Sequence, residues 1–265
     1  MTALQETLAA RLAAGQKGLI VYITAGCPDL AATRRAVLAA AAAGADIVEI
    51  GIPFSDPIAD GPVIQKAAAA ALKNGLKTAA VLDLVRDITA AAPVPIALMT
   101  YINTILAFGP GRFAAAAAAA GAAGVIVPDL PLEEAGLLAD ACRDNRLDLI
   151  HFIAPTSPPD RVAAICARAS GFLYCVSTTG VTGVQTVDYS RLAPLIAAAR
   201  RATAVPVAIG FGIGSPAAAV AAAAHADAVI VGSAVVEQLA QSGPAGVGDL
   251  VAAIRQALDR AGEQS

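Results

Sequence analysis

Residues 46–65 read Asp46-Ile47-Val48-Glu49-Ile50-Gly51-Ile52-Pro53-Phe54-Ser55-Asp56-Pro57-Ile58-Ala59-Asp60-Gly61-Pro62-Val63-Ile64-Gln65. The mostly apolar run 46–50 predicts a short strand. Residues 51–62 hold three prolines and two glycines, which predict a stiff, sharply turning loop. An alanine-rich helix is expected over 63–73. A strand, a loop and a helix in this order form the repeating unit of parallel α/β folds.

The same unit recurs along the whole chain. Strands are predicted at 19–24, 46–50, 95–99, 124–127, 148–153, 172–176, 205–209 and 228–231. Helices are predicted near 31–43, 63–73, 78–91, 110–120, 132–145, 158–169, 189–201 and 216–224, with a last one at 246–261. Five or six such units would leave an open sheet, whereas eight predict a closed (β/α)8 or TIM barrel. No Ser/Gly/Pro-rich linker interrupts the pattern, so residues 1–265 are expected to form one domain.

An extra helix is expected before the first strand, over residues 2–14. Leu4, Leu8 and Leu12 recur there at every fourth position and form an apolar stripe. Such a stripe predicts that the helix caps the floor of the barrel. A loosely docked terminal helix is an equally open alternative.

Composition excludes several classes of protein. The net charge of -3, the absence of Trp and an aromatic content of 4% argue against nucleic acid and anionic membranes as partners. The four cysteines form no CxxC pair and the two histidines lack metal-ligand spacing, so we expect buried thiols and no metal. Residues 202–226 carry no charge, but prolines and glycines interrupt them, which argues against a membrane span. Without a signal sequence, the chain is expected to be cytoplasmic.

Glu49 is the first candidate for chemistry, because it is a charged residue near the carboxyl end of an apolar strand. Active residues of (β/α)8 barrels lie at these strand ends. Burial penalises the carboxylate, so the pKa of Glu49 should be raised toward the range that general acid–base catalysis uses. The alternative is a structural glutamate held in an ion pair.

Asp60 is the second candidate. It lies in the loop that follows Glu49, and a carboxylate there can swing over the strand mouth to face Glu49. The alternative is that Asp60 caps the helix that begins near Val63.

Glycines after the last strands predict an anion site. Gly210-Phe211-Gly212-Ile213-Gly214-Ser215 follows the seventh strand and Gly232-Ser233 follows the eighth. The loops at these positions of the barrel recurrently bind phosphate through backbone N–H groups and helix N-termini. Gly180-Val181-Thr182-Gly183, after the sixth strand, is expected to add an amide and a movable flap. Tight turns are the alternative explanation of each cluster.

Three further residues are weaker candidates. Tyr174 is expected either to hydrogen-bond Glu49 or simply to pack. Asp129 follows the fourth strand and serves either a loop or the site. His151 has no nucleophile beside it and is expected to be an ordinary barrel residue.

The stretch from Val48 to Gln65 closely resembles the signature of tryptophan synthase α chains. Weaker agreement follows in order at Thr24-Ala25-Gly26, Tyr101-Ile102-Asn103, Gly180–Gly183, Gly210–Ile213 and Gly232-Ser233, so the resemblance covers essentially the whole chain. It implies catalytic roles for Glu49, Asp60 and Tyr174. It implies substrate binding by Tyr22, Ile64, Met99, Ile126, Asp129, Thr182, Gly183, Phe211, Gly212, Gly232 and Ser233.

The resemblance also implies a reaction and a partner. Members of the family act in tryptophan biosynthesis as carbon–carbon lyases, and cleave indole-3-glycerol phosphate to indole and glyceraldehyde 3-phosphate without a cofactor. They usually work in an α2β2 heterotetramer with a pyridoxal-phosphate β subunit, which receives indole through a tunnel. The loop around Asp56 is the expected docking element.

The sequence departs from the family pattern at Cys27, where Asp is frequent, at Ala70, where Arg is frequent, and at Thr178, where some members are basic. These changes bear on loop ordering and partner contacts. Two other functions stay open at this stage. One is another phosphate-binding barrel enzyme, namely an epimerase, an isomerase or an indoleglycerol-phosphate synthase, and the other is a non-catalytic allosteric scaffold.

Overall fold

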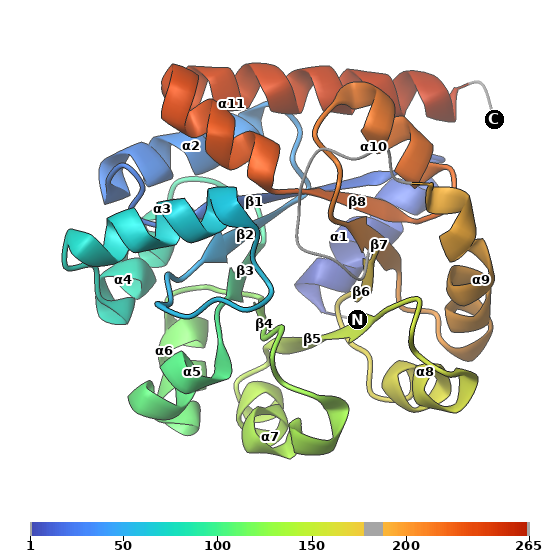
Figure 1. Cartoon of the computed structure of the whole chain (residues 1–265), viewed down its shortest axis with the longest axis horizontal. Coiled ribbons are helices and arrows are strands. Elements are labelled where there is room, and N and C mark those ends of the chain that lie inside the picture. The colour runs from blue at the N-terminus through green and yellow to red at the C-terminus, as the bar shows by residue number, and fades with distance from the viewer. Residues whose placement is uncertain (1, 178–187, 264–265) are drawn as a thin grey trace.

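Eight parallel strands close into a barrel in the computed structural model, which describes residues 2–177 and 188–263 (Figure 1). Each strand pairs with the next in the chain, and β1 pairs with β8 to complete the ring. The strands are β1 (Gly18–Thr24), β2 (Ile47–Gly51), β3 (Ile96–Met99), β4 (Gly124–Ile126), β5 (Asp148–Ile153), β6 (Leu173–Val176), β7 (Val207–Gly210) and β8 (Ala228–Val231). The predicted barrel is therefore confirmed, and all strand ends lie within two residues of their predicted positions.

Helices surround the barrel. They are α1 (Ala3–Ala13), α2 (Leu30–Ala42), α3 (Pro62–Lys73), α4 (Thr78–Thr89), α5 (Ile102–Phe108), α6 (Pro110–Ala119), α7 (Gly136–Asp144), α8 (Pro159–Cys166), α9 (Ala193–Ala202), α10 (Pro216–Ala223) and α11 (Ser233–Gly262), with 3₁₀ turns η1 (Leu132–Glu134) and η2 (Tyr189–Leu192).

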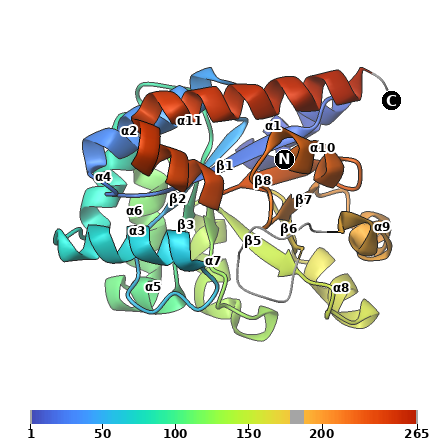
Figure 2. The same cartoon turned by 45° about the horizontal axis from the view of Figure 1, so that its top comes forward.

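Two helical regions differ from the sequence prediction. The short helix α5 was not predicted, because its seven residues are too few to show a clear period. The last helix was predicted only over 246–261, but α11 already begins at Ser233. Gly243, with a non-helical φ of 68° and ψ of -167°, and Pro244 separate two helices that meet at a kink, so the segment before the kink looked like a loop. Beyond the bend, α11 packs across α2 (Figure 2).

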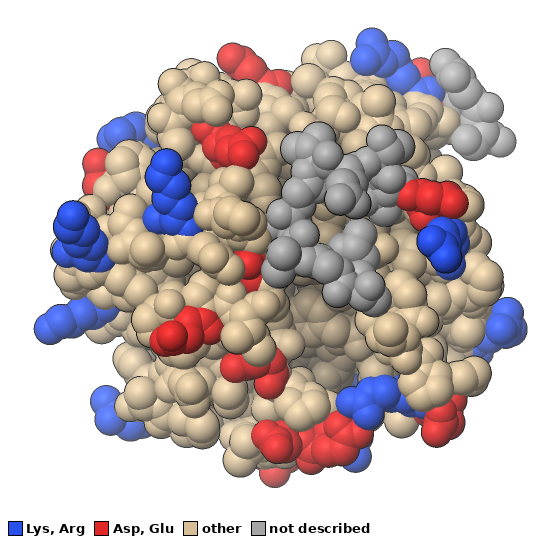
Figure 3. Space-filling model, in the orientation of Figure 1, with Lys and Arg blue, Asp and Glu red and all other residues tan. Residues whose placement is uncertain are grey.

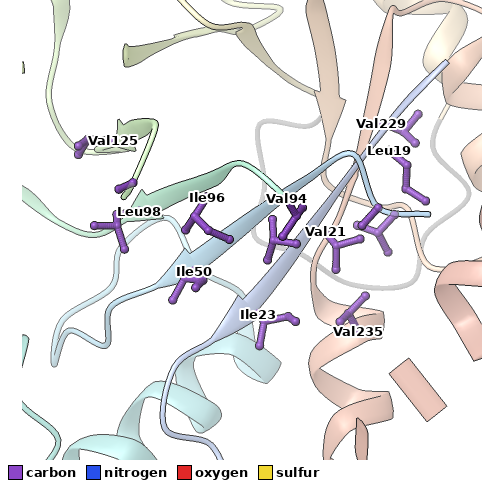
Figure 4. Close-up of a cluster of buried hydrophobic side chains, with 14 of the residues drawn as sticks. Leu19, Val21, Ile23, Ile50, Val94, Ile96, Leu98, Val125, Val229 and Val235 are labelled. Carbon is purple, nitrogen blue, oxygen red and sulfur yellow. The ribbon is translucent and has the colours of Figure 1, made fainter. Parts of the chain in front are cut away.

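The strands are apolar on both faces because both faces are buried. In β1, Leu19, Val21 and Ile23 pack against the helices, while Ile20 and Tyr22 face into the barrel. Figure 4 shows part of this outer layer, with side chains of β1, β2, β3, β4 and β8 and Val235 of α11. Helices outside and packed side chains inside leave no polar face, which explains why the strands lack an alternating pattern.

The floor of the barrel is closed by α1. Leu4 and Leu8 are 0% exposed, and they belong to the cluster that fills the barrel interior. A Cβ at Gly18 would lie 2.5 Å from the Leu8 side chain, and one at Gly124 would lie 2.7 Å from that of Leu4. Glycine at the start of β1 and β4 therefore lets the two leucines enter, which confirms the predicted cap and excludes a loosely docked helix.

In the described parts of the chain, no helix combines the length and the apolar character needed to cross a membrane. The same residues contain no cluster of three or more His, Cys, Asp or Glu side chains that is placed to hold a metal ion. Cys142, Cys166 and Cys175 are buried thiols and Cys27 is half-buried.

Candidate active site

A cavity of about 580 Å³ opens at the carboxyl ends of the strands. Its walls come from the ends of β1, β3, β6 and β8, and from the first turns of α3, α10 and α11. Charged side chains stand mostly around the rim of this face, and a hollow is visible near its middle (Figure 3). Most of the predicted site residues line the cavity, namely Tyr22, Asp60, Ile64, Met99, Tyr174, Phe211, Gly212, Gly232 and Ser233.

Glu49 is fully buried beside this cavity and does not line it. Its strand places it level with Tyr22 of β1, whose ring does line the cavity. Neither carboxyl oxygen of Glu49 has a hydrogen-bond partner, and no ion pair among the described residues includes it. Burial raises the pKa of Glu49 from 4.5 to about 8. The alternative of an ion-paired structural glutamate is therefore wrong, and the acid is kept protonated at neutral pH.

Asp60 enters the cavity from the loop between β2 and α3. It is 6% exposed, although its neighbours Ser55, Asp56 and Ile58 are all exposed. Burial raises the pKa of Asp60 to about 6, and a hydrogen bond from the Tyr101 hydroxyl opposes that rise. Its side chain is therefore mainly ionised at neutral pH.

Asp60 is not the cap of α3. The residue at the N-cap is Gly61, and no side chain caps this helix. Pro62 occupies the first helical position, where its missing N–H leaves nothing unsatisfied. The capping alternative is therefore wrong, and the Asp60 carboxylate is left for the cavity.

The two acids share the same surroundings. The negative charges of Glu49 and Asp60 both raise the pKa of Tyr22 and of Tyr174, in addition to burial. Two phenols of the cavity wall therefore feel both carboxyl groups. One acid is neutral and the other is charged near pH 7, and such a pair suits proton transfer by one and charge stabilisation by the other.

Tyr22 of β1 and Tyr174 of β6 are accommodated in the same way. A Cβ at Gly51 would clash with the Tyr22 hydroxyl, and a Cβ at Gly210 would clash with the Tyr174 ring. In each case a glycine on the next strand makes room for the phenol. Tyr174 stacks on Phe152 with 4.8 Å between ring centroids. It makes no hydrogen bond to Glu49, so the packing alternative for Tyr174 is the observed one.

Two helix N-termini meet the other end of the cavity. Phe211 and Gly212 both have positive φ, of 72° and 75°, and this bend brings the chain to α10. Ser215 caps α10 by accepting a hydrogen bond from the Ala218 N–H at 3.2 Å. Ser233 begins α11 directly after Gly232. Helix N-termini carry unpaired N–H groups and partial positive charge, so this end of the cavity is suited to an anion.

Besides Glu49, two described residues of the predicted site do not line this cavity. Ile126 is buried in the barrel interior and does not reach the cavity wall. Asp129 lines a separate hollow together with His151, and it accepts a hydrogen bond from the Ile102 N–H at 2.9 Å. Thr182 and Gly183, with Thr178 and the rest of 178–187, lie outside the described residues.

The prediction assigned no role to some residues of the site. Tyr189 and Glu237 also line the cavity, and the Tyr101 hydroxyl lies near Asp60. Tyr101 had a signal, because it belongs to one of the family-like stretches. The others lie outside any such motif, and only the closure of the barrel brings them together.

Comparisons with known proteins agree on one family. The family model described as tryptophan synthase alpha chain matches residues 8–260. The tryptophan synthase alpha chain of Synechococcus elongatus is 48% identical over 261 residues, 98% of each chain. That of Burkholderia cenocepacia is 44% identical over 268 residues, 99% of each chain. A solved structure of Mycobacterium tuberculosis tryptophan synthase superposes with a TM-score of 0.91 at 36% identity, covering 97% of this chain and 98% of that one.

Proposed function

The chain belongs to the tryptophan synthase alpha chain family, and we propose that its mouth cavity cleaves indole-3-glycerol phosphate with Glu49 and Asp60 as the reacting acids. The family reaction is a retro-aldol cleavage to indole and glyceraldehyde 3-phosphate, in tryptophan biosynthesis. The observation that carries the assignment of roles is the pair of buried acids with separated pKa values, about 8 for Glu49 and about 6 for Asp60.

Glu49 moves the protons. The neutral acid donates its proton to C3 of the indole ring, which becomes an electron-poor indolenine. The resulting carboxylate takes the proton of the side-chain hydroxyl while the bond from C3 to that carbon breaks. The electron pair of this bond returns to the ring, the aldehyde leaves and Glu49 is protonated again. Because Glu49 does not line the cavity, the proposal requires its side chain to turn toward the bound substrate.

Asp60 stabilises the ring. As a carboxylate it accepts a hydrogen bond from the indole N–H and offsets the positive charge that develops on the nitrogen during C3 protonation. The apolar side chains of Ile64 and Met99 line the same cavity, which suits a flat aromatic ring between them. Tyr22 and Tyr174 complete the wall around the two acids.

The phosphate is held at the opposite end. Gly212, Gly232 and Ser233 line the cavity where α10 and α11 begin, and their backbone N–H groups are the proposed donors. An anchored phosphate fixes the distance from the tail to the reacting bond, so binding energy is used to orient the ring against the acids.

A β subunit is the proposed partner, in an α2β2 complex. The surface proposed for docking consists of Asp56 and Ile58 of the loop after β2 together with Leu106 of α5. Ile58 is 77% exposed and Leu106 is 45% exposed, which is unusual for large apolar side chains. Both lie on segments that meet at Tyr101, so they belong to one region. Mixing the chain with a β subunit is expected to raise the cleavage rate, and an unchanged rate would contradict the pairing.

The decisive experiment measures indole release from indole-3-glycerol phosphate by the purified chain. Release of indole with an equal amount of glyceraldehyde 3-phosphate is the expected result. No indole, alone or with a β subunit, would contradict the proposal and would favour another phosphate-binding barrel enzyme or a non-catalytic scaffold.

A further inference from the structure

Tyr101 contacts the loop of Asp60 at both of its ends. Its ring stacks on Phe54, with 5.2 Å between centroids and 25° between planes. Its hydroxyl accepts a hydrogen bond from the Ala59 N–H at 3.0 Å and lies near the Asp60 carboxylate, whose pKa it lowers. Tyr101 is 3% exposed and does not line the cavity. The phenol therefore reaches Asp60 from the side away from the cavity.

Tyr101 is itself held in place by Asp129. Tyr101 stands at the N-cap of α5, a position at which its own side chain caps nothing. The Asp129 carboxylate, at the end of β4, accepts the hydrogen bond of the next N–H, that of Ile102. A negative charge at a helix N-terminus is favourable, so Asp129 fixes the start of α5 and with it the phenol. This contact explains why Asp129 lies outside the cavity.

Few other contacts of the loop hold Asp60 in place. Ser55, Asp56 and Ile58 are exposed to solvent, and the loop spans residues between the end of β2 and Gly61. Gln65 holds the backbone, because its Nε2 donates to the Asp60 carbonyl at 2.8 Å. The carboxylate itself lies beside the Tyr101 hydroxyl.

We infer that Tyr101 is a positioning residue for the reaction, which holds the loop that carries Asp60 so that the carboxylate is aimed at the indole nitrogen. The inference rests on the role proposed for Asp60 and deepens it. Tyr101 acts through Asp60 alone, since it is not part of the cavity wall.

The protonation of Asp60 provides a readout that a purely structural tyrosine would not affect. The hydrogen bond from Tyr101 lowers the pKa of Asp60, against the rise caused by burial. The other titratable groups near it are Tyr22 of β1, Tyr174 of β6 and Glu49 of β2, and they stay in place when the hydroxyl is removed. Without the hydroxyl, the pKa of Asp60 should rise above about 6, so activity should be lost at a higher pH than in the wild type.

Tyr101→Phe tests this, because it keeps the ring stacked on Phe54 and removes only the hydroxyl. A hydrogen bond to a charged group is worth enough to lower kcat about 10- to 100-fold. KM should change little, and the acid limb of the pH–rate profile should move to higher pH. Wild-type kcat with an unshifted limb would overturn the inference. Thermal unfolding of the same sample checks that the variant is folded.

A double-mutant cycle with Asp60→Asn separates action through Asp60 from a general effect. If the hydroxyl works through the carboxylate, Tyr101→Phe should cost little more in the Asp60→Asn background. Equal losses in both backgrounds would overturn the inference. If Asp60→Asn itself keeps full activity, the proposed role of Asp60 fails instead, so the two failures are distinguishable.

Asp129 offers a graded comparison. In Asp129→Asn the amide oxygen can still accept the Ile102 N–H, whereas Asp129→Ala removes the acceptor. The alanine variant should reproduce part of the Tyr101→Phe loss and its shifted acid limb, and the asparagine variant should retain more activity than alanine. The reverse order would contradict the idea that Asp129 supports Tyr101.

Discussion

Two buried acids lie three residues apart, one just before β2 and one in the middle of it, and their surroundings are opposite. Asp46, before the strand, is 7% exposed and Glu49, within it, is 0% exposed. Asp46 accepts a hydrogen bond from the Leu19 N–H at 2.8 Å and forms ion pairs with Arg11 and Arg255. Glu49 has no partner for either oxygen among the described residues.

The difference shows how the barrel separates stability from chemistry. At the floor, a buried charge is compensated and joins α1, β1 and α11. At the mouth, a buried acid without a partner stays neutral and keeps a proton that it can donate. This division is expected for (β/α)8 barrels, whose upper face carries the reaction and whose lower face carries stability.

The largest expected effect is that of Glu49→Gln. The amide keeps the size of the acid but cannot transfer a proton, so kcat should fall about 10²–10⁴-fold with little change in KM. A steady-state assay of indole release measures both constants. Near-wild-type turnover would show that Glu49 transfers no proton in the reaction. The contrast between Glu49 and Asp46 would then have no catalytic meaning.

The same variant should be more stable than the wild type. The pKa of Glu49 is raised on folding from 4.5 to about 8. Between these values the unfolded chain is ionised while the folded chain holds the proton, so the wild type loses stability as the pH rises through this window. Glutamine has no such penalty, and its advantage in the free energy of unfolding should grow from pH 4.5 to 8 and then level off. Urea unfolding at several pH values measures it.

The second effect concerns the floor. Asp46→Asn leaves Arg255, whose side chain is only 8% exposed, without its full counter-charge. Breaking a buried ion pair from one side costs about 3–5 kcal/mol in the free energy of unfolding. The kcat of the folded variant should be unchanged, because Asp46 lies at the far end of the strand. Denaturant unfolding and indole release are the two measurements.

Asp83→Asn is the matched control for this variant. Asp83 pairs with Arg86 on the surface of α4, where both side chains are more than half exposed. Exposed pairs contribute about 0–1 kcal/mol, so this loss should be several times smaller. Equal losses in the free energy of unfolding for Asp46→Asn and Asp83→Asn would contradict the idea that the buried ion pairs at the floor contribute more than a surface pair.

Much of this arrangement could be predicted from the sequence. Apolar runs alternating with alanine-rich stretches gave the strands and their order, because that pattern depends on local residues alone. Glu49 could be identified because a single acid in an apolar strand is conspicuous. The start of α11 was missed because Gly243 and Pro244 resemble the end of a segment, whereas the chain is helical on both sides of the kink that they form.

The roles of the loop residues could not be predicted from local sequence. Asp60 is a residue type that often caps helices, and it lies just before α3, so the sequence leaves the capping role open. In the structure its side chain lies beside the hydroxyl of Tyr101, which is far away in the sequence. Asp129 resembles a site residue because it follows a strand. Its carboxylate instead accepts a hydrogen bond from the Ile102 N–H, and that contact depends on how β4 and α5 meet. Such roles follow from contacts between residues that are far apart in the sequence, and sequence spacing does not predict these contacts.

The next prediction concerns the pH dependence of the cleavage activity. Asp60 must be ionised and Glu49 protonated, so kcat/KM should be highest between their pKa values of about 6 and about 8. Activity should fall about tenfold per pH unit on either side of this window. The limb above pH 8 should disappear in Glu49→Gln, measured on its residual activity. Asp46→Asn should keep both limbs, and loss of either one would show that the floor acid is coupled to the reaction.

The smallest expected effect tests whether polar groups at the mouth are all alike. Ser215 caps α10 beside the cavity, and Asp29 caps α2 by accepting the Ala32 N–H at 2.6 Å without lining the cavity. Replacing either cap by alanine should cost about 1 kcal/mol in the free energy of unfolding. The two variants should differ in substrate binding, because the first turn of α10 borders the proposed phosphate site and frays when its cap is lost. Ser215→Ala should therefore raise KM up to about threefold with kcat unchanged, on the scale of a weakened helix-terminus interaction. Asp29→Ala should leave KM as it is. If both caps change KM equally, the helix N-terminus at α10 has no particular role in holding the anion, and the mouth would resemble the floor in using its polar groups for stability.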